Sequence, residues 1–411
     1  MQNQILIVDL HRISNQQMES FYRTHENLVQ HVNSPVRRLL MDEIDWTKRL
    51  IGIKGSRGVG KTTFLLQFAK DHFKPSDRRC LYINFNNFYF TTHSLIEFAG
   101  EFYKNGGRTL LIDQTFKYEN WSKELRYCYD TFPELHIVFS GSPVMRLVEG
   151  NTDLQDVVSS YNLRGFSFRE FLNLKSNNQF QAYTLQQIIE NHKQIADNIC
   201  NTVNPFDYFN DYLHHGLYPF FLESRNYSEN LLKTVNMMLE VDILLIKKID
   251  IEYLSKIRKL LYKIMQCAPC LLNVSQLSID IETSRSTVMN YIKYLQDARL
   301  LNLLYAYGDS FPKKPRFAFL QNTNLMHMIV PCKVSTEFEH KTFIYNTLHA
   351  YHKINLGKQH NDFLIDETIN LKYLKEVDVN FKSNQHVIYA VDSILSGSKN
   401  NIPVWLFGFL Y

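Results

Sequence analysis

The segment Leu50-Ile-Gly-Ile-Lys-Gly-Ser-Arg-Gly-Val-Gly-Lys-Thr-Thr63 joins an apolar run to a glycine-rich turn and a helix-forming stretch. From Gly55 to Thr62 it matches the pattern Gly-x-x-x-x-Gly-Lys-[Ser/Thr] in full. The apolar run before the turn predicts a strand, and residues 63–69 after it predict a helix. A chance match in an ordinary glycine-rich turn is the alternative. Because both flanks have the required character, we predict a phosphate-binding loop.

Each part of this loop has a chemical role. Glycines let the backbone turn tightly and approach phosphate oxygens, and successive N–H groups at a helix N-terminus then face the anion. Lys61 would neutralise the β- and γ-phosphates, and the hydroxyl of Thr62 would bind Mg²⁺. We therefore expect ATP and Mg²⁺ as cofactors. The candidate nucleotide-binding residues are Gly55, Ser56, Arg57, Gly58, Val59, Gly60, Lys61, Thr62 and Thr63.

The metal also needs a carboxylate. The apolar run 109–113 ends in Asp113, which we predict as a second Mg²⁺ ligand together with Thr62, although a carboxylate that only ends a strand is the alternative. ATPases of the additional-strand class usually place a glutamate next, as the general base. Here the position of the base is Gln114, and an amide can hold a water but cannot take its proton. We predict slow or absent hydrolysis. A natural departure and a substitution made to trap ATP both fit this residue.

The same region contains candidates for a γ-phosphate sensor and for an arginine finger. Ser140 and Ser142 follow the apolar run 136–139 and are candidate sensors of the γ-phosphate, with a simple turn as the alternative. An arginine finger is hard to place, because residues 150–162 contain no lysine or arginine. Arg146, Arg164 and Arg169 flank that gap.

The pattern of apolar runs predicts the fold class. Short apolar runs at 50–53, 80–85, 109–113 and 136–140 alternate with amphipathic stretches, which is typical of a parallel sheet covered by helices on both faces. Residues 166–304 are mainly helical in character, and residues 305–319 are loop-like. Strands are predicted again at 362–365, 387–391 and 404–411.

Composition excludes several classes. A length of 411 residues suggests two to four domains, and the net charge of +4 permits but does not favour nucleic-acid binding. No apolar run is long enough to span a membrane, and the first residues lack the character of a secretory signal. Six dispersed cysteines do not suggest a disulfide framework. We expect a cytoplasmic protein with reduced thiols and no membrane partner.

Residues 257–304 give a second signal, a helix-turn-helix pattern that ends in a wing-like strand. In its third helix, 286–295, the residues Val288, Tyr291, Ile292 and Leu295 fall on one face. The other face has Arg285, Asn290 and Lys293, which are candidate DNA contacts. A winged helix that only packs against protein is the alternative, because this face carries only two cations.

The order of these motifs resembles a known family. The phosphate loop, the runs 111–125 and 137–142, and Gly165-Phe-Ser-Phe-Arg-Glu-Phe-Leu172 are similar to prokaryotic AAA-type P-loop ATPases whose chains end in a nuclease-like domain of unknown function. The resemblance implies an α/β P-loop NTPase fold with a parallel sheet, followed by a helical lid, a winged helix and a small α/β domain similar to restriction endonucleases. Gln114 departs from the family's usual glutamate, and Gln155 and Asp156 stand where it has arginines.

The resemblance implies five parts. They are an N-terminal helical lead-in at 1–48, the ATPase domain at 49–172, the lid at 173–245, the winged helix at 246–310 and the nuclease-like domain at 311–411. In the last part, Asp362, Asp366 and Glu367 supply carboxylates, but Lys372 stands where the family has a glutamate. We therefore expect no nuclease activity.

Two remaining motifs are predicted to be structural. The pair Cys267 and Cys270 lacks a second ligand pair for zinc, and His214 with His215 is expected to pack rather than to bind metal. The sequence thus favours a nucleotide-dependent switch. The alternative is an ATP-regulated DNA-binding protein of mobile-element or defence type. Self-association is left open.

Overall fold

Five strands form one parallel sheet in the N-terminal part of the chain. They are β1 (Leu50–Lys54), β2 (Cys80–Asn84), β3 (Thr109–Asp113), β4 (His136–Gly141) and β5 (Ser159–Asn162), in the order β2-β3-β4-β1-β5. The first four strands confirm the predicted ones. Their side chains are almost entirely buried, as expected for parallel strands that read as continuous apolar runs. The edge strand β5 was not predicted, because its Ser-Ser-Tyr-Asn sequence has no apolar run.

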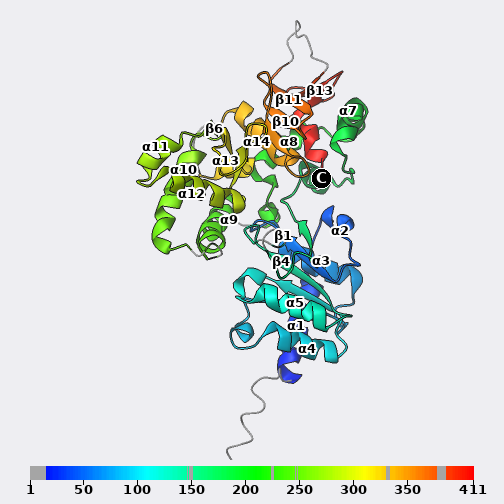
Figure 1. Cartoon of the computed structure of the whole chain (residues 1–411). Helices are drawn as coiled ribbons and strands as arrows, with labels where there is room; N and C mark the ends of the chain where they lie inside the picture. The colour runs from blue at the N-terminus through cyan, green and yellow to red at the C-terminus, as the bar shows by residue number, and fades with distance from the viewer. Residues whose placement is uncertain are drawn as a thin grey trace, which may run out of the picture. The chain divides into compact units, whose positions relative to one another are not determined.

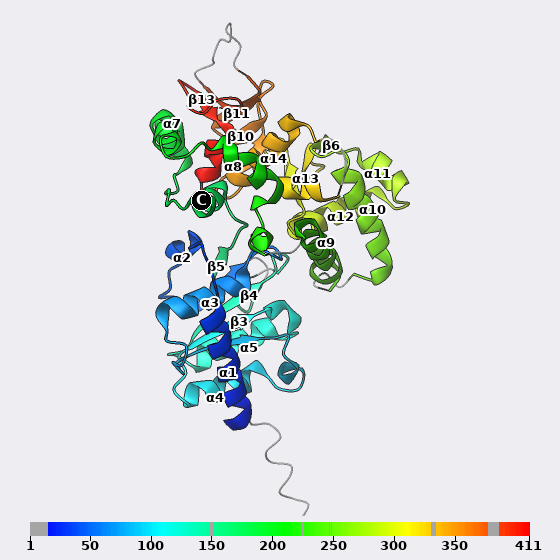
Figure 2. The same cartoon turned by 180° about the vertical axis from the view of Figure 1, so that it is seen from behind.

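Helices cover both faces of this sheet, as predicted. The helices of the first unit are α1 (Asn15–His31), α2 (Leu40–Glu43), α3 (Lys61–His72), α4 (Leu95–Lys104) and α5 (Trp121–Thr131), and its short 3₁₀ turns are η1 (Phe88–Thr91) and η2 (Thr115–Lys117). Helix α5 lies in front of the sheet in Figure 1, whereas α1 and α3 lie in front of it in Figure 2. Helix α4 packs against α5, and Ser94 and Glu97 form a capping box at its start.

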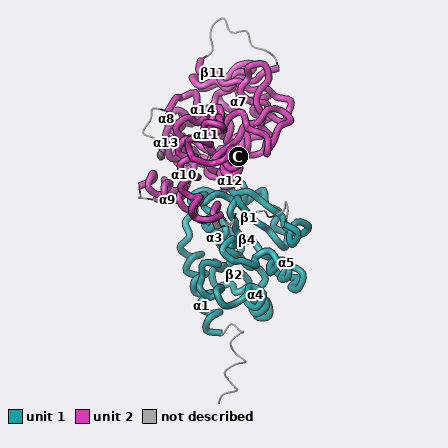
Figure 3. Tube along the Cα trace, turned by 60° about the vertical axis from the view of Figure 1, so that its left-hand side comes forward, with its two compact units in different colours: residues 1–164 teal, residues 165–411 magenta. Residues whose placement is uncertain are grey.

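The computed structural model describes residues 15–145, 147, 151–223, 226–245, 247, 249–329, 334–376 and 386–411. The chain folds as two units, residues 1–164 and 165–411 (Figure 3). Arg146, one of the flanking arginines, lies outside the described residues. No helix of the described part combines the length and the apolar character that a membrane crossing requires.

The middle of the second unit contains three helices and a small antiparallel sheet. The elements are α10 (Leu254–Met265), β6 (Cys270–Leu271), α11 (Val274–Asp280), α12 (Arg285–Asp297), β7 (Leu301–Leu304) and β8 (Phe317–Leu320), with the strand order β6-β8-β7. The predicted helices at 274–281 and 286–295 are confirmed. The predicted loop ends at Arg316 rather than residue 319, because Phe317 begins β8.

A second five-stranded sheet lies near the end of the chain. Its strands are β9 (Ile354–Leu356), β10 (Phe363–Ile365), β11 (Ile369–Leu374), β12 (Val387–Val391) and β13 (Asn401–Pro403), in the order β13-β12-β11-β10-β9. Strands β9 to β11 pair antiparallel, and β11 to β13 pair parallel. The strand predicted at 404–411 was wrong. Residues Val404–Phe409 form the buried 3₁₀ helix η7, and an apolar run alone does not distinguish a strand from a buried helical segment.

The other helical elements of this unit are α6 (Phe168–Ser176), α7 (Leu185–Cys200), α8 (Phe206–Asp211), η3 (Tyr212–Gly216), η4 (Pro219–Leu222), α9 (Tyr227–Met237), η5 (Met238–Leu245), η6 (Ile251–Tyr253), α13 (Thr323–Ile329) and α14 (Thr336–Leu348). Helices α6 and α7 pack against η7. The backbone N–H of Tyr183 donates to the carbonyl of Phe409 at 2.8 Å. The start of the predicted lid therefore shares its core with the last residues of the chain. The five-part division stays a prediction.

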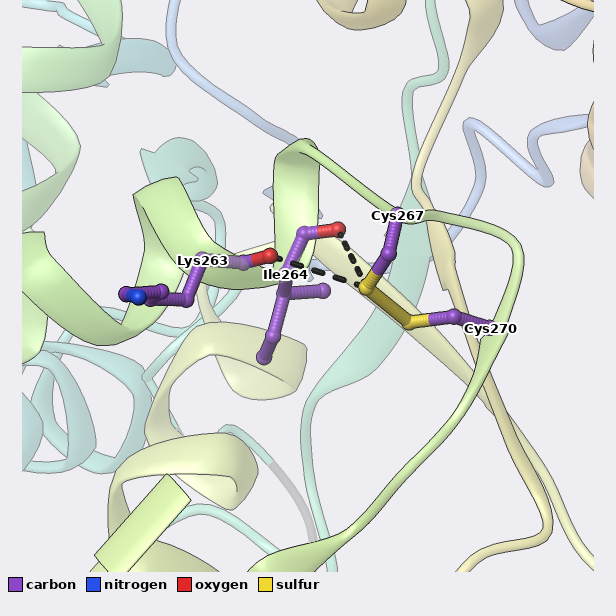
Figure 4. The surroundings of a disulfide bond; sticks show 4 residues. All are labelled: Lys263, Ile264, Cys267 and Cys270. Carbon is purple, nitrogen blue, oxygen red and sulfur yellow. Dashed lines mark hydrogen bonds between the residues drawn. A yellow bond between two sulfur atoms is a disulfide. The ribbon is translucent and has the colours of Figure 1, made fainter. Parts of the chain in front are cut away.

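The cysteines differ from expectation at one place. Cys267 and Cys270 form a disulfide between the end of α10 and the start of β6 (Figure 4). Their Cα atoms are 5.4 Å apart, a separation that a disulfide spans readily. The general expectation of reduced thiols was therefore wrong for these two residues. Cys80 and Cys128 are buried free thiols, as expected.

Candidate functional site

The predicted phosphate loop connects the end of β1 to the first turn of α3. Gly58 has φ 79° and Gly60 has φ 94°, so both residues adopt the left-handed conformation that glycine tolerates without steric cost. Gly60 is the N-cap of α3, which has Lys61 as its first residue. The N-terminus of α3 is therefore placed directly after the glycine turn, as an anion-binding loop requires.

Asp113 is the centre of the polar network at the end of β3. It is only 1% exposed. Thr62 Oγ1 donates to its Oδ2 at 2.6 Å, and the phenol of Tyr82 donates to the same oxygen at 3.0 Å. Ser140 Oγ and the backbone N–H of Gln114, the latter at 2.9 Å, donate to Oδ1. Four donors therefore converge on one buried carboxylate, a group whose oxygens are also suitable ligands for a divalent cation.

Basic side chains lie around the loop. Lys61 Nζ donates to the carbonyl oxygens of Gly55 and Ser56 at 2.7 and 2.9 Å. The guanidinium of Arg57 lies 5.0 Å from the ring centre of Phe116. Partial burial and the charge of Arg57 lower the pKa of the neighbouring Lys117 ammonium. Lys61 and Arg57 thus place positive charge at the loop itself.

The phosphate loop packs against Leu163, next to Arg164, the last residue of the first unit. The N–H of Leu163 donates to the carbonyl of Lys54 at 2.7 Å, and a Cβ on Gly55 would lie 2.5 Å from the Leu163 carbonyl oxygen. Arg38 donates to the carbonyl of Val59 at 3.3 Å and to that of Arg164 at 2.6 Å. Because a Cβ at position 55 would collide with the Leu163 carbonyl, glycine is required where the phosphate loop passes the segment that follows β5.

Gln114 lies in an unusual backbone conformation, with φ 56°. Positive φ is uncommon for a residue other than glycine and recurs at functional sites. Its N–H donates to Ser140 Oγ at 3.1 Å as well as to Asp113. The position next to Asp113 is thus fixed through its backbone, whichever side chain it carries.

The two sensor candidates differ in their contacts. Ser140 bonds directly to Asp113, whereas the hydroxyl of Ser142 accepts a hydrogen bond from the N–H of Val144 at 3.4 Å. Arg169, one of the flanking arginines, is buried in the second unit, where its Nε donates to the carbonyl of Tyr411 at 3.1 Å. The sensor role and the arginine finger stay predictions.

Sequence reasoning missed Tyr82 and Arg38. Tyr82 lies on β2, the neighbour of β3, and burial together with the charge of Asp113 raises the pKa of its phenol. The sequence does show a tyrosine near the end of an apolar run. Its contact with Asp113 can be predicted only once β2 is known to be the neighbour of β3. Arg38 lies just before α2, far from the loop in sequence.

The candidate DNA contacts lie on α12. Its predicted inner face is buried, as expected, and Arg285 and Asn290 are exposed. Lys293 is partly exposed and pairs with Asp297 at 2.9 Å, which reduces the positive charge of this face.

The candidate carboxylates near the C-terminal sheet, Asp362, Asp366 and Glu367, each contact a basic side chain. Asp362 pairs with Lys341 at 2.7 Å, Asp366 contacts His352 at 2.6 Å, and Glu367 pairs with Lys353 at 3.0 Å. Lys372 is on β11. Among the residues that the structure describes, these three carboxylates are not found grouped closely enough to hold one ion.

Comparison with known families agrees with this geometry. Residues 47–172 match a family described as an AAA domain, and the match contains the phosphate loop, Asp113 and Ser140. This part of the chain is an AAA-type P-loop domain. Residues 206–319 match a domain of unknown function (DUF8612). The AAA-type match thus includes all five strands of the first unit's sheet, and the second match includes α12, which contains the candidate DNA contacts.

Two relatives come from Methanocaldococcus jannaschii. The uncharacterized protein MJ1637 is 26% identical over 304 residues, 70% of this chain and 62% of its own length. The uncharacterized protein MJ1544 is 25% identical over 263 residues, 61% of this chain and 55% of its own length. The chain therefore spans less than two thirds of either relative.

Similar solved structures include C. elegans PCH-2, with 15% identity, a TM-score of 0.23 and coverage of 70% of this chain and 69% of that one. The Aeropyrum pernix ORC1 protein in complex with DNA has 10% identity, a TM-score of 0.29 and coverage of 75% and 90%.

Proposed function

We propose that the AAA-type domain binds ATP with Mg²⁺ and that the protein works as a nucleotide-dependent switch that hydrolyses ATP slowly or not at all. The observation that supports this most strongly is the 2.6 Å hydrogen bond between Thr62 and Asp113. It brings together the two side chains that P-loop proteins use to hold the metal.

The oxygen donors present fit Mg²⁺, which prefers carboxylate and hydroxyl ligands. Thr62 and Asp113 would hold the ion, which supplies neutralisation of phosphate charge when bound. Lys61 and the N–H groups before α3 would hold the phosphates. On this basis we expect an ATP dissociation constant in the micromolar range or below, about −8 kcal/mol of binding free energy.

Slow hydrolysis follows from the residues around the expected water. Gln114 has an amide that can orient a water but not deprotonate it. The carboxylate of Asp113 is occupied by four hydrogen bonds and would be a metal ligand. Neither residue supplies a general base.

The switch is proposed from the packing behind the loop. Lys54 and Gly55 contact Leu163, and Arg38 joins the loop to the carbonyl of Arg164. The second unit begins with the next residue, Gly165. A shift of the loop on nucleotide binding would therefore reach the segment that connects the two units.

Nucleotide binding is tested by replacing the lysine of the loop. Lys61→Ala should weaken binding of a fluorescent ATP analogue at least about tenfold, because a charge-assisted contact to phosphate is lost. Lys70→Ala on the same helix is the matched control, since Lys70 is exposed and its ammonium donates to the carbonyl of Val32 at 2.8 Å. Equal affinities of the two variants would refute the assignment.

We also propose that α10, α11, α12 and their small sheet form a winged helix, and that the C-terminal sheet is nuclease-like but inactive. The helix order and the β6-β8-β7 pairing support the first proposal. The exposed Arg285 and Asn290 on α12 favour a second candidate function, ATP-regulated DNA binding.

A further inference from the structure

Three metal-ligating side chains converge in the second unit, away from the nucleotide site. His214 is on η3, His327 on α13 and Glu339 on α14. Their candidate ligand atoms all lie within 4.8 Å of one another. Nε2 of His327 is 2.5 Å from Glu339 Oε1, and Nε2 of His214 is 3.7 Å from the same oxygen. The two imidazole rings have centroids 3.7 Å apart.

The scaffold around these side chains is built by buried hydrogen bonds. Thr323 Oγ1 donates to the carbonyl of Leu213 at 2.6 Å, and Asn324 Nδ2 donates to the same carbonyl at 2.7 Å. Asn324 Oδ1 in turn accepts from the N–H of Leu217 at 2.9 Å. These contacts fix α13 to both ends of the π-helical turn η3. Short π-helical turns are rare in proteins, and those that occur are often found at functional sites.

We propose that His214, His327 and Glu339 form a binding site for one borderline divalent cation such as Zn²⁺, with a fourth coordination position open to solvent. Two imidazole nitrogens and one carboxylate oxygen are a donor set that Zn²⁺ accepts, and three protein ligands leave one position for water. The side chains of the three residues are 33%, 22% and 10% exposed, in that order, so solvent reaches the site.

The distances are compatible with this occupant after a small adjustment. Two ligands of a tetrahedral Zn²⁺ ion lie about 3.4 Å apart, given metal–ligand distances near 2.1 Å. The His214–Glu339 separation of 3.7 Å is already close to this value. The His327–Glu339 contact, now a hydrogen bond, would have to open by less than about 1 Å. Each of the three elements supplies one ligand, so a bound ion would link η3, α13 and α14.

A metal titration of the full chain tests the site. The probe is Zn²⁺ alone, added to protein that is freed of metal by a chelator, has no histidine tag and is kept without reductant so that the Cys267–Cys270 disulfide stays closed. Isothermal titration calorimetry should give one tight site per chain, and the melting temperature should rise. His327→Ala and Glu339→Gln should each lower the Zn²⁺ affinity at least about 100-fold.

His215→Ala is the matched control. His215 is adjacent to His214 in sequence but pairs with Asp211 at 3.1 Å, so its loss should leave the affinity unchanged. Circular dichroism of the metal-free variants checks that they fold, and His327→Gln replaces His327→Ala where that variant does not. Absence of a tight site in the parent, or an equal loss in His215→Ala and His327→Ala, would overturn the proposal.

Discussion

Thr62 on the first turn of α3 and Asp113 at the end of β3 are joined by a 2.6 Å hydrogen bond from Oγ1 to Oδ2. The loop before Thr62 leaves β1, and Asp113 ends β3. These two strands are not neighbours, since β4 lies between them in the sheet. Ser140 follows on β4 itself and contacts the other oxygen of the same carboxylate. The carboxyl ends of three strands thus supply one polar cluster, the usual place for a ligand site in a parallel sheet.

Replacing Thr62 tests whether this pair binds Mg²⁺. Thr62→Ala should remove most of the increase in ATP-analogue affinity that Mg²⁺ produces, about tenfold or more, because the ion loses one protein ligand. Thr62→Ser keeps the hydroxyl and should behave like the parent. The measurement is a fluorescence titration with Mg²⁺ and with a chelator. A Mg²⁺ effect of the same size in Thr62→Ala and Thr62→Ser would show that the hydroxyl is not a ligand.

The buried His25 should make stability depend on pH. Burial lowers the pKa of its imidazole from 6.5 to about 4, and its Nδ1 accepts the N–H of Tyr82 at 3.0 Å. The folded state therefore binds the proton less well than the unfolded chain. Stability is complete above pH 6.5 and falls as the pH drops towards 4. From pH 7 to 5 this residue should cost about 2 kcal/mol of unfolding free energy.

The matched variant is His25→Asn, whose side-chain oxygen can still accept the N–H of Tyr82 but does not titrate. Denaturant unfolding at pH 7 and pH 5 should show a larger loss in the parent than in His25→Asn. The same pH dependence in both proteins would mean that other groups are responsible.

Local sequence predicted those parts of the fold in which local chemistry decides the structure. The apolar runs of β1 to β4 need burial on both faces, and the glycines of the loop need positive φ, so both are visible in the sequence. Strand β5 is polar and pairs only at the edge of the sheet, which no local pattern shows. The last residues were predicted as a strand, but they form η7 because their burial against α6 and α7 is a tertiary property.

The same distinction applies to the candidate sites. Asp113 and the loop were found because each belongs to a local motif. Tyr82 was missed, because its contact with Asp113 depends on β2 being the neighbour of β3. His327 and Glu339 were missed for the same reason, since His214 joins them only through the long-range packing of three separate elements.

DNA binding by α12 should depend more on Arg285 than on Lys293. Arg285 is exposed, whereas Lys293 pairs with Asp297, so it has less charge to offer a phosphate. If the protein binds DNA, Arg285→Ala should weaken binding and reduce the salt dependence by about one slope unit, and Lys293→Ala should do less. A gel-shift assay with and without ATP, over a range of salt, measures both effects.

The control for this experiment is Lys233→Ala on α9, which removes a surface lysine paired with Glu229 at 2.7 Å. It should leave the salt dependence unchanged. Absence of binding by the parent at low salt would favour the alternative that these helices only pack against protein.

Restoring a carboxylate at Gln114 tests the account of slow hydrolysis. The backbone N–H of this residue is held by Asp113 and Ser140, so a glutamate would occupy the same place. General-base catalysis typically contributes about 10² to 10⁴ in rate. Gln114→Glu should therefore raise ATP turnover at least about tenfold with little change in ATP affinity. Phosphate release and analogue binding measure the two quantities, and Gln30→Glu on the exposed surface of α1 is the control.

The outcomes separate different defects. A faster Gln114→Glu variant would mean that the loop, the metal ligands and the phosphate contacts are competent and that only the base is missing. An unchanged rate would place a second defect elsewhere, and the absence of a lysine or arginine from residues 150–162 would be the first suspect, because such a residue would stabilise transition-state charge. If the parent already turns over faster than about 1 per second, an ordinary enzymatic rate, position 114 is not the position of the base.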